Sequence, residues 1–311
     1  MRLINGTFIT SDKNKHDTDG DTLNDSVEMG PQKYNIVRDT FIGTHKFYYY
    51  KWESSPNEVD SDFDGYNDDI DAKPLIKIND MTYIFYELGG DSFLEKEAKH
   101  RAKKLERYCV YGVDTVVDFA DKWNSMGIDS NGKVEYEISD VYTVFHGGPN
   151  SFTVGSYYDS VQKCEIYEEI NVNKIIYLDN KKIGTLHLSS CNNGNLDFLN
   201  NGSITGMYQN MAIQFLKQMT DIKQVKAWDG YSYYLYGVEW SSEPSDFWDF
   251  FFGDSSFDQW SLAKNGKKRW PTGLITYERD SNGNILYKPN LKYFDVNLNY
   301  AQIVSVTEVI Q

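Results

Sequence analysis

The sequence predicts an α/β fold with a mostly parallel central sheet, preceded by a small module of acidic loops. From Met81 onward, short apolar runs of β-type residues alternate with helical patterns, which is typical of a parallel sheet with helical crossovers. Before that point the same spacing of acidic residues occurs twice. A hydrophobic share of 40% in 311 residues is enough for a substantial core. We therefore expect two domains, residues 1–77 and residues 78–311.

The chain is strongly acidic, with a formal net charge of -15. Residues 1–80 alone contain 16 acidic and 9 basic side chains. Nucleic acids and anionic membranes bind clusters of Lys and Arg, so this charge argues against both as partners and favours cations. No stretch approaches the roughly 20 apolar residues of a membrane-spanning helix, and we expect no membrane span.

Two segments of the first domain carry carboxylates at loop positions 1, 3, 5, 9 and 12. Ca2+ takes about six to eight oxygen ligands, and ligands on alternate residues of a loop converge on one point. Position 7 would add a backbone carbonyl. A solvated acidic loop is the alternative, but the duplication favours a Ca2+ site in each segment. The expected ligands are Asp17, Asp19, Asp21, Leu23, Asp25 and Glu28 in the first loop and Asp60, Asp62, Asp64, Tyr66, Asp68 and Asp71 in the second.

These loops resemble the calcium loops of thrombospondin type 3 and dockerin-like repeats rather than EF-hands. No helix of normal length precedes either loop, and Thr22 stands where the first loop would usually have glycine. The resemblance implies an extracellular setting, where such bacterial repeats are common. No apolar signal-peptide core follows Met1. We therefore expect a secreted or cell-surface location, with this chain as part of a larger bacterial protein.

The second domain is expected to alternate strands with helices. Met207, Met211, Phe215 and Met219 repeat every four residues, which indicates core packing rather than chemistry. An Asn-Gly turn predicts a hairpin at 274–290, and the aromatic run 246–260, which has no clear period, is expected to form a C-terminal extension. The expected strands are 81–87, 109–113, 139–145, the run leading to Cys191, and 224–228, and the expected helices are 92–105, 115–126 and 203–219.

Three polar residues directly follow expected strands: His146, Cys191 and Asp229. Active sites of parallel sheets form at the carboxyl ends of strands, so these residues should share one edge. A thiol becomes a useful nucleophile once deprotonated, and a nearby imidazole or helix N-terminus promotes this. His146 could supply the imidazole, and a helix is expected after the turn that follows Cys191. The N–H groups of Gly147 and Cys191 could then form an oxyanion hole.

The segments "DVYTVFHGG" (140–148) and "IGTLHLSSCNNG" (183–194) resemble the signature of caspase-like cysteine peptidases. In that family a hydrophobic strand ends in His-Gly, and a later one ends in a small residue and Cys. The likeness covers roughly residues 81–230 and is greatest to the caspase-like domains of bacterial surface and polymorphic-toxin proteins. It implies a three-layer sandwich, His146 as general acid/base, Cys191 as nucleophile, and a peptide or protein substrate.

The sequence departs from the family two residues before the cysteine. Many relatives have an acidic residue or Gln there, which helps to select the residue preceding the cleaved bond, whereas this chain has Ser189. Asp229 lies where relatives often line the same pocket. We expect Ser189 and Asp229 to contact the substrate, and Asp229 to favour Arg or Lys.

The leading hypothesis is a calcium-stabilised or calcium-activated cysteine endopeptidase, which could process its own chain or serve as a toxin or effector domain. The chain could instead be a non-catalytic, calcium-stiffened binding module with an inactive caspase-like domain, or a hydrolase of other amides. Cys109 and Cys164 are expected to be inert core cysteines. With three cysteines, at least one thiol is free unless it pairs with another chain. His187 is expected to point to solvent or into a satisfied core site.

Overall fold

The computed structural model shows two separately packed units. The first comprises Met1–Asn79 together with Gly127–Glu137, and the second comprises Asp80–Met126 together with Ile138–Gln311. Residues 127–137 thus cluster with the first unit, although the sequence pattern assigned them to the second. The structure describes residues 3–4, 7–8, 11–30, 33–40, 43–50, 53–90, 92–191, 193–194, 210–229, 232–235, 238–241, 262–264, 267–269, 273–289 and 308–310.

The first unit is built mostly of loops and short strands. β1 (Leu3–Ile4) pairs with β2 (Thr7–Phe8), and β3 (Lys33–Thr40) pairs with β4 (Gly43–Tyr50), both antiparallel. The one-turn helix α1 (Asp25–Glu28) lies at the end of the first acidic loop. The β3–β4 pair occupies most of the aromatic segment that separates the two acidic loops.

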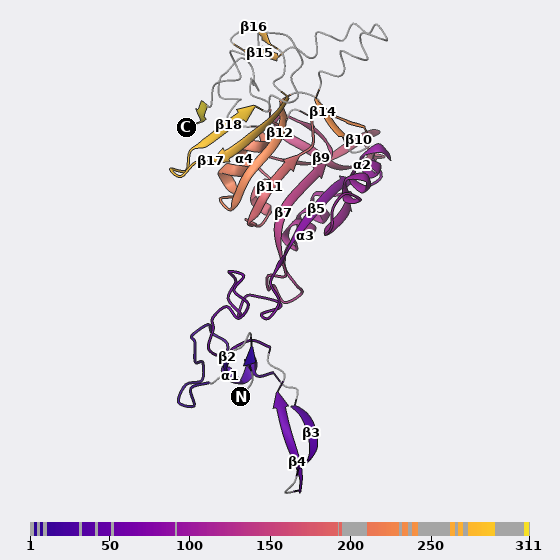
Figure 1. The fold of residues 1–311 in the computed structure, drawn as a ribbon. Helices are drawn as coiled ribbons and strands as arrows, with labels where there is room; N and C mark the ends of the chain where they lie inside the picture. The colour runs from indigo at the N-terminus through magenta and orange to yellow at the C-terminus, as the bar shows by residue number, and fades with distance from the viewer. Residues whose placement is uncertain are drawn as a thin grey trace. The chain divides into compact units, whose positions relative to one another are not determined.

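Eight strands of the second unit form one mixed sheet in the order β19-β18-β17-β12-β11-β7-β5-β6 (Figure 1). The pairs β5–β6, β7–β11 and β11–β12 are parallel, while β12–β17, β17–β18 and β18–β19 are antiparallel. The prediction of an α/β fold with a mostly parallel central sheet is confirmed. The strands are β5 (Asn79–Glu87), β6 (Tyr108–Val113), β7 (Tyr136–Val144), β11 (Ile183–Leu188), β12 (Ile222–Asp229), β17 (Gly273–Arg279), β18 (Ile285–Pro289) and β19 (Glu308–Ile310).

Helices pack on both faces of this sheet because neighbouring residues of a strand point to opposite faces. On one face, Ile84 of β5 packs with Leu94 of α2. On the other, the ring of Phe85 lies 5.0 Å from that of Phe119 in α3, and Phe215 of α4 joins the same aromatic cluster. The arrangement is compatible with a three-layer sandwich. The helices are α2 (Ser92–Ala102), α3 (Val116–Asn124), α4 (Met211–Gln218) and the 3-10 helix η1 (Ile175–Tyr177).

A second, antiparallel sheet follows β7, in the order β10-β9-β8. Its strands are β8 (His146–Gly148), β9 (Ser151–Asp159) and β10 (Cys164–Asn171). The sequence pattern did not indicate this sheet, because apart from Phe152, Val154 and Ile170 most side chains of β9 and β10 are half-buried or exposed. Cys164 begins β10 and is exposed, so its expected core position is wrong, whereas Cys109 of β6 is half-buried.

Several expectations concern the C-terminal third of the chain. The hairpin at 274–290 is confirmed by the β17–β18 pair. Met211, Phe215 and Met219 are buried as expected. Met207 and the aromatic run 246–260 lie outside the described residues. The remaining antiparallel pairs are β13 (Ser232–Leu235) with β14 (Val238–Ser241) and β15 (Leu262–Lys264) with β16 (Lys267–Arg269).

In the described ranges, no helix combines the length and the apolar character needed to cross a membrane.

Candidate functional site

The two acidic loops fold in the same way around their aspartates. Asp17 at position 1 accepts hydrogen bonds from the amides of positions 4 and 6, at 2.6 and 3.1 Å. Asp60 does the same in the second loop, at 2.8 Å in both cases. Asp21 and Asp64 at position 5 each accept from the amide of position 7, at 2.7 and 3.0 Å. The duplicated spacing therefore reflects one loop conformation used twice.

Positions 4 and 6 have positive φ in both loops. The first loop has Gly20 (φ 88) and Thr22 (φ 84), and the second has Phe63 (φ 60) and Gly65 (φ 98). Glycine takes this left-handed conformation without strain, whereas a residue with a β-carbon does not. Each loop thus keeps one strained residue, and the absence of glycine at Thr22 does not change the path of the chain.

The aspartates at position 9 hold position 2 of their own loops. Asp25 accepts from both the amide and the hydroxyl of Thr18, at 2.8 Å each. Asp68 accepts from the amide and the hydroxyl of Ser61, at 2.8 and 2.6 Å. Both aspartates are buried. These two predicted ligands therefore have a structural role in closing the loops.

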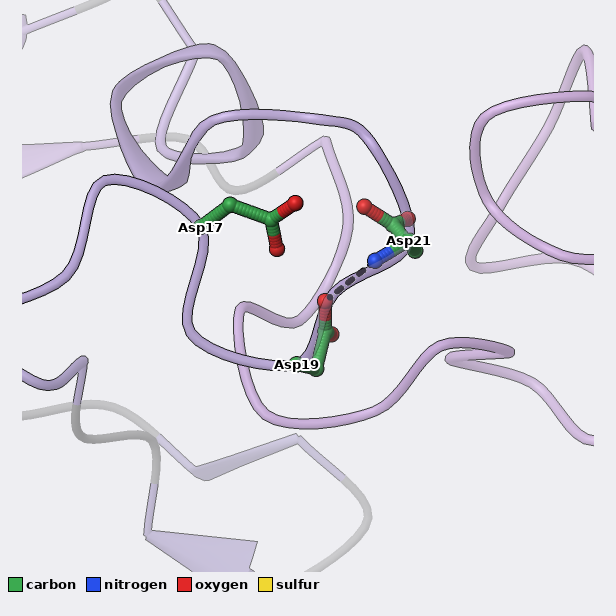
Figure 2. Close-up of side chains that lie close together, drawn as sticks. All are labelled: Asp17, Asp19 and Asp21. Atoms are coloured by element: carbon green, nitrogen blue, oxygen red, sulfur yellow. Dashed lines mark hydrogen bonds between the residues drawn. The ribbon is translucent and has the colours of Figure 1, made fainter.

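Three groups of carboxylates have ligand atoms within 4.8 Å of one another and could hold a metal ion. Two of them are positions 1, 3 and 5 of each loop, and Figure 2 shows the carboxyl groups of the first such group converging. The third group joins the two loops. The groups are Asp17, Asp19 and Asp21; Asp60, Asp62 and Asp64; and Asp21, Glu28 and Asp68.

Several oxygens of these carboxylates are buried without a hydrogen-bond partner in the described part of the chain. Glu28 is fully buried, and its Oε1 accepts from Ser54 Oγ at 2.9 Å while its Oε2 has no such partner. Asp62 is 7% exposed, and neither of its carboxylate oxygens has a hydrogen-bond partner among the described residues. The same is true of one oxygen of Asp19 and one of Asp21. An ionised carboxylate is rarely buried unless it is paired or binds a metal, so these oxygens fit a cation.

Burial perturbs the same carboxyl groups. It raises the pKa of Glu28 to about 8, and repulsion from nearby aspartates adds to the effect. It raises the pKa of Asp62 and of Asp68 to about 6, again with repulsion from neighbouring aspartates. In the absence of a cation, these pKa values make the protonated forms more stable than they are in water. A bound divalent cation would favour the ionised forms instead.

A segment distant in sequence, Gly127–Glu137, completes the second loop. Lys133 Nζ donates to the carbonyl oxygens of Asp68 and Asp71, at 3.2 and 3.3 Å. Val134 forms an isolated parallel bridge with Asp71. The last predicted ligand of the second loop is thus held from outside the loop.

His146 and Cys191 lie at matching positions beyond two neighbouring parallel strands. β7 and β11 pair with Thr143 opposite Leu188. His146 lies three residues after Thr143, and Cys191 lies three residues after Leu188. His146 is exposed and Cys191 is half-buried. The structure thus brings both residues to the same edge of the sheet.

Gly147 lets the two turns approach closely. A β-carbon added to Gly147 would lie 2.7 Å from the β-carbon of Ser190 and 3.2 Å from the carbonyl oxygen of Ser151. Real β-carbons do not approach other atoms as closely as 2.7 Å, so a side chain here would push the turns apart. The glycine after His146 is therefore required by the approach of the cysteine turn.

The turn that carries the cysteine is tied to three other elements. The amide of Gly194 donates to the carbonyl oxygen of Trp228 in β12 at 2.9 Å. Its carbonyl oxygen accepts from the hydroxyl of Tyr277 in β17 at 2.6 Å. The carbonyl oxygen of Asn193 accepts from the amide of Ala212 in α4 at 3.2 Å. These bonds hold the turn on the scaffold of the sheet.

The N-terminus of α4 takes part in this support. Its first three amides donate to the carbonyl oxygens of Pro149 and Asn193 and to the side chain of Asn210, at 3.0, 3.2 and 2.9 Å. The sequence predicted a helix whose N-terminus would promote the thiolate of Cys191. In the structure these three amides bond to the surrounding turns.

The other residues singled out from the sequence lie in different surroundings. Ser189 is fully buried, so its side chain does not line the surface beside the cysteine. Asp229 is the last residue of β12, and its side chain lies outside the described part of the structure. His187 Nε2 lies 2.8 Å from Asp140 Oδ1, and its ring stacks on Tyr142 at 4.0 Å. Of the two alternatives expected for His187, solvent or a satisfied core site, the ring is half-buried rather than in the core, and it has a carboxylate partner.

Two residues beside the site had no functional signal in the sequence. Phe93 of α2 lies edge-on to the ring of His146, with ring centroids 5.9 Å apart. Asn193 was visible only as a turn residue, and yet its side chain bonds to the hairpin that begins at His146. Both relationships join segments far apart in sequence, so no local pattern reveals them.

No protein-family model matches this sequence, and a search of curated proteins finds no significant match.

Proposed function

We propose that this chain is a cysteine endopeptidase, similar to the caspase-like peptidases, with an N-terminal module that binds calcium. The observation that carries the proposal is the register of β7 and β11, which places His146 and Cys191 equally far beyond the pair Thr143–Leu188. A nucleophile and its general acid/base act on the same bond, so they must leave the scaffold at the same edge. Gly147, which permits the close approach of their turns, supports the same assignment.

In the proposed reaction the thiolate of Cys191 attacks the carbonyl carbon of a peptide bond. The N–H groups of Gly147 and Cys191 stabilise the oxyanion that forms. His146 gives a proton to the leaving amine as the carbon–nitrogen bond breaks, and a thioester remains on Cys191. A water molecule, deprotonated by His146, then hydrolyses the thioester and releases the acid product and the thiol.

The proposed metal ion is Ca2+, because the candidate ligands are carboxylate and carbonyl oxygens on alternate residues of a loop. The buried, unpartnered oxygens of Glu28 and Asp62 favour a cation over a solvated loop, whose carboxylates would face water. An ion held by Asp21, Glu28 and Asp68 would join the two loops. The ion would neutralise these carboxylates and stabilise the loops, and no step of the cleavage depends on it.

The proposed setting is outside the cell, where calcium is abundant, as part of a larger bacterial surface or toxin protein. The proposed substrate is a peptide or a protein, which could be the parent chain itself.

Thiol reactivity tests the assignment of Cys191. Purified protein is treated with a low concentration of iodoacetamide, and the alkylation of each cysteine is followed by mass spectrometry. Cys164 is an internal control because its thiol is more exposed to the reagent than that of Cys191, which is half-buried. We expect Cys191 to react faster than Cys164 in spite of its lower exposure, and we expect His146→Ala to remove the difference.

Peptidase activity is tested directly by incubating the protein with a peptide library, with and without calcium. We expect cleavage that is lost in Cys191→Ala. If Cys191 reacts no faster than Cys164 and no peptide is cleaved, the non-catalytic binding module becomes the better account.

A further inference from the structure

Asn193, two residues after the cysteine, is fully buried and bonds to the hairpin that begins at His146. Its Nδ2 donates to the carbonyl oxygen of Gly148 at the end of β8. The same nitrogen donates to the carbonyl oxygen of Ser151 at the start of β9, at 2.9 Å. One side chain from the cysteine turn therefore holds both strands of the histidine hairpin.

The chemistry of the side chain determines its orientation. Two carbonyl oxygens face it, and only the nitrogen of a carboxamide can donate to both. Asn193 Oδ1 points elsewhere and is buried without a hydrogen-bond partner among the described residues. A buried acceptor without a partner costs stability. The side-chain amide is thus oriented so that its nitrogen donates to both carbonyl oxygens, at the cost of leaving its oxygen buried.

The main chain of Asn193 is fixed on the side of the cysteine. Its carbonyl oxygen accepts from Ala212 at the start of α4, and the next residue, Gly194, donates to Trp228 of β12. A β-carbon on Gly147 would lie 3.3 Å from Asn193 Nδ2, which shows that the side chain lies directly against the His-Gly segment. The main chain of Asn193 therefore belongs to the fixed cysteine turn, while the side chain of Asn193 holds the hairpin that begins at His146.

We propose that Asn193 is a positioning residue, which sets the separation between the turn of Cys191 and the turn of His146 and Gly147. This role rests on the proposed function, since it assumes that His146 and Cys191 act together. Misplacing reacting groups by about 1 Å can reduce the rate roughly 10²-fold. Loss of the two bonds from Asn193 Nδ2 should therefore shift the turn of His146 relative to that of Cys191 and decouple the imidazole from the thiol, while the rest of the sheet stays folded.

Two substitutions test the role. Asn193→Ala removes both hydrogen bonds, and Asn193→Asp keeps the shape of the side chain but turns oxygens toward the two carbonyl groups. We expect each variant to lower kcat about 10²-fold with a much smaller change in KM. The rate of alkylation of Cys191 is then measured between pH 5 and pH 9 by mass spectrometry. We expect the pH profile of each variant to move to that of His146→Ala.

Asn150→Ala is the matched control, because Asn150 is an exposed asparagine of the same hairpin. It should keep the wild-type kcat and pH profile. Asn193→Ser keeps a single donor, so its kcat should fall between those of the wild type and Asn193→Ala. This variant still tests the role if Asn193→Ala and Asn193→Asp melt at a much lower temperature.

Folded Asn193 variants with the wild-type profile and kcat would overturn the positioning role while leaving the dyad intact. If His146→Ala itself leaves the profile of Cys191 unchanged, the dyad is wrong, and the role of Asn193 is wrong with it.

Discussion

The amide of Ala72 donates to the carbonyl oxygen of Val134 at 2.8 Å, so the end of the second acidic loop is bonded to a segment far along the chain. The amide of Val134 donates in return to the carbonyl oxygen of Ile70 at 2.7 Å. This segment, Gly127–Glu137, includes the first two residues of β7, Tyr136 and Glu137. These two bonds fix the end of the second loop to Val134 within the first unit.

Removal of calcium should destabilise the first unit. A ligand that binds only the folded state adds about 2.7 kcal/mol at 100 times its dissociation constant. We expect EGTA to lower the melting temperature, and Glu28→Gln and Asp62→Asn to reduce the response to added calcium. Glu58→Gln is the control, because Glu58 is exposed and lies between the loops. A melting curve that EGTA leaves unchanged would count against calcium binding.

The stability of the calcium-free protein should fall as the pH rises. The folded state raises the pKa of Glu28 from its ordinary 4.5 to about 8, and those of Asp62 and Asp68 from 3.8 to about 6. At pH values between the unfolded and the folded pKa, the folded state binds more protons than the unfolded chain. The free energy of unfolding therefore falls as the pH rises through this range. The stability from these groups is fully present below about pH 4 and is lost by about pH 8.

Added calcium should oppose this trend, because protons and the ion compete for the same oxygens. The stabilisation by calcium should therefore be larger at pH 8 than at pH 5. Thermal melts at both pH values, each with calcium and with EGTA, check the sign. A calcium effect that is larger at pH 5 would show that these carboxylates do not bind the ion.

Gly147→Ala should impair activity far more than Gly148→Ala. The new β-carbon at 147 would lie 2.7 Å from the β-carbon of Ser190, whereas a β-carbon at 148 meets no atom within 4 Å. Overpacking of this kind costs about 1–3 kcal/mol, and here it would separate the turns of the proposed dyad. The measurement compares the turnover and the melting temperature of the two variants, and we expect Gly147→Ala to have the lower turnover. Equal turnover in both would show that the close approach is not needed.

Cys191→Ala and His146→Ala should each abolish peptidase activity, and the double variant should be no less active than either. Members of a dyad act as one unit, so their losses do not add. Turnover of a cleavable peptide measures all three variants, and circular dichroism checks that they fold. If either single variant keeps near-wild-type turnover, the role assigned to that residue is wrong.

Asp229→Ala should alter the choice of substrate. A carboxylate in the pocket would favour Arg before the cleaved bond, because Arg can make a bidentate contact. The variant should lose that preference and keep some cleavage after neutral residues. Profiling a peptide library with both proteins tests this, and identical profiles would remove Asp229 from the site. An Asp-Gly turn at this point would then be its only role.

Much of the architecture follows from local sequence patterns. The alternation of apolar strands and helices from Met81 predicts the parallel part of the sheet, because each element buries its own periodic face. The Asn-Gly turn predicts the β17–β18 hairpin. The three-stranded sheet β8–β10 and the exposed Cys164 were missed, since this stretch has little periodic apolar character and exposure depends on the whole fold.

For the candidate sites, the sequence by itself determined which residues have the required chemistry: the carboxylates at fixed spacing, a histidine and a cysteine after strands, and a glycine beside the histidine. Only the tertiary structure decided which of them meet. The register of β7 and β11 places His146 level with Cys191, and Asp68 joins Asp21 and Glu28 across two loops. Burial and strand pairing are properties of the whole chain, and no local spacing encodes them. For the same reason Asn193, a turn residue in the sequence, becomes the link between the two proposed catalytic turns in the fold.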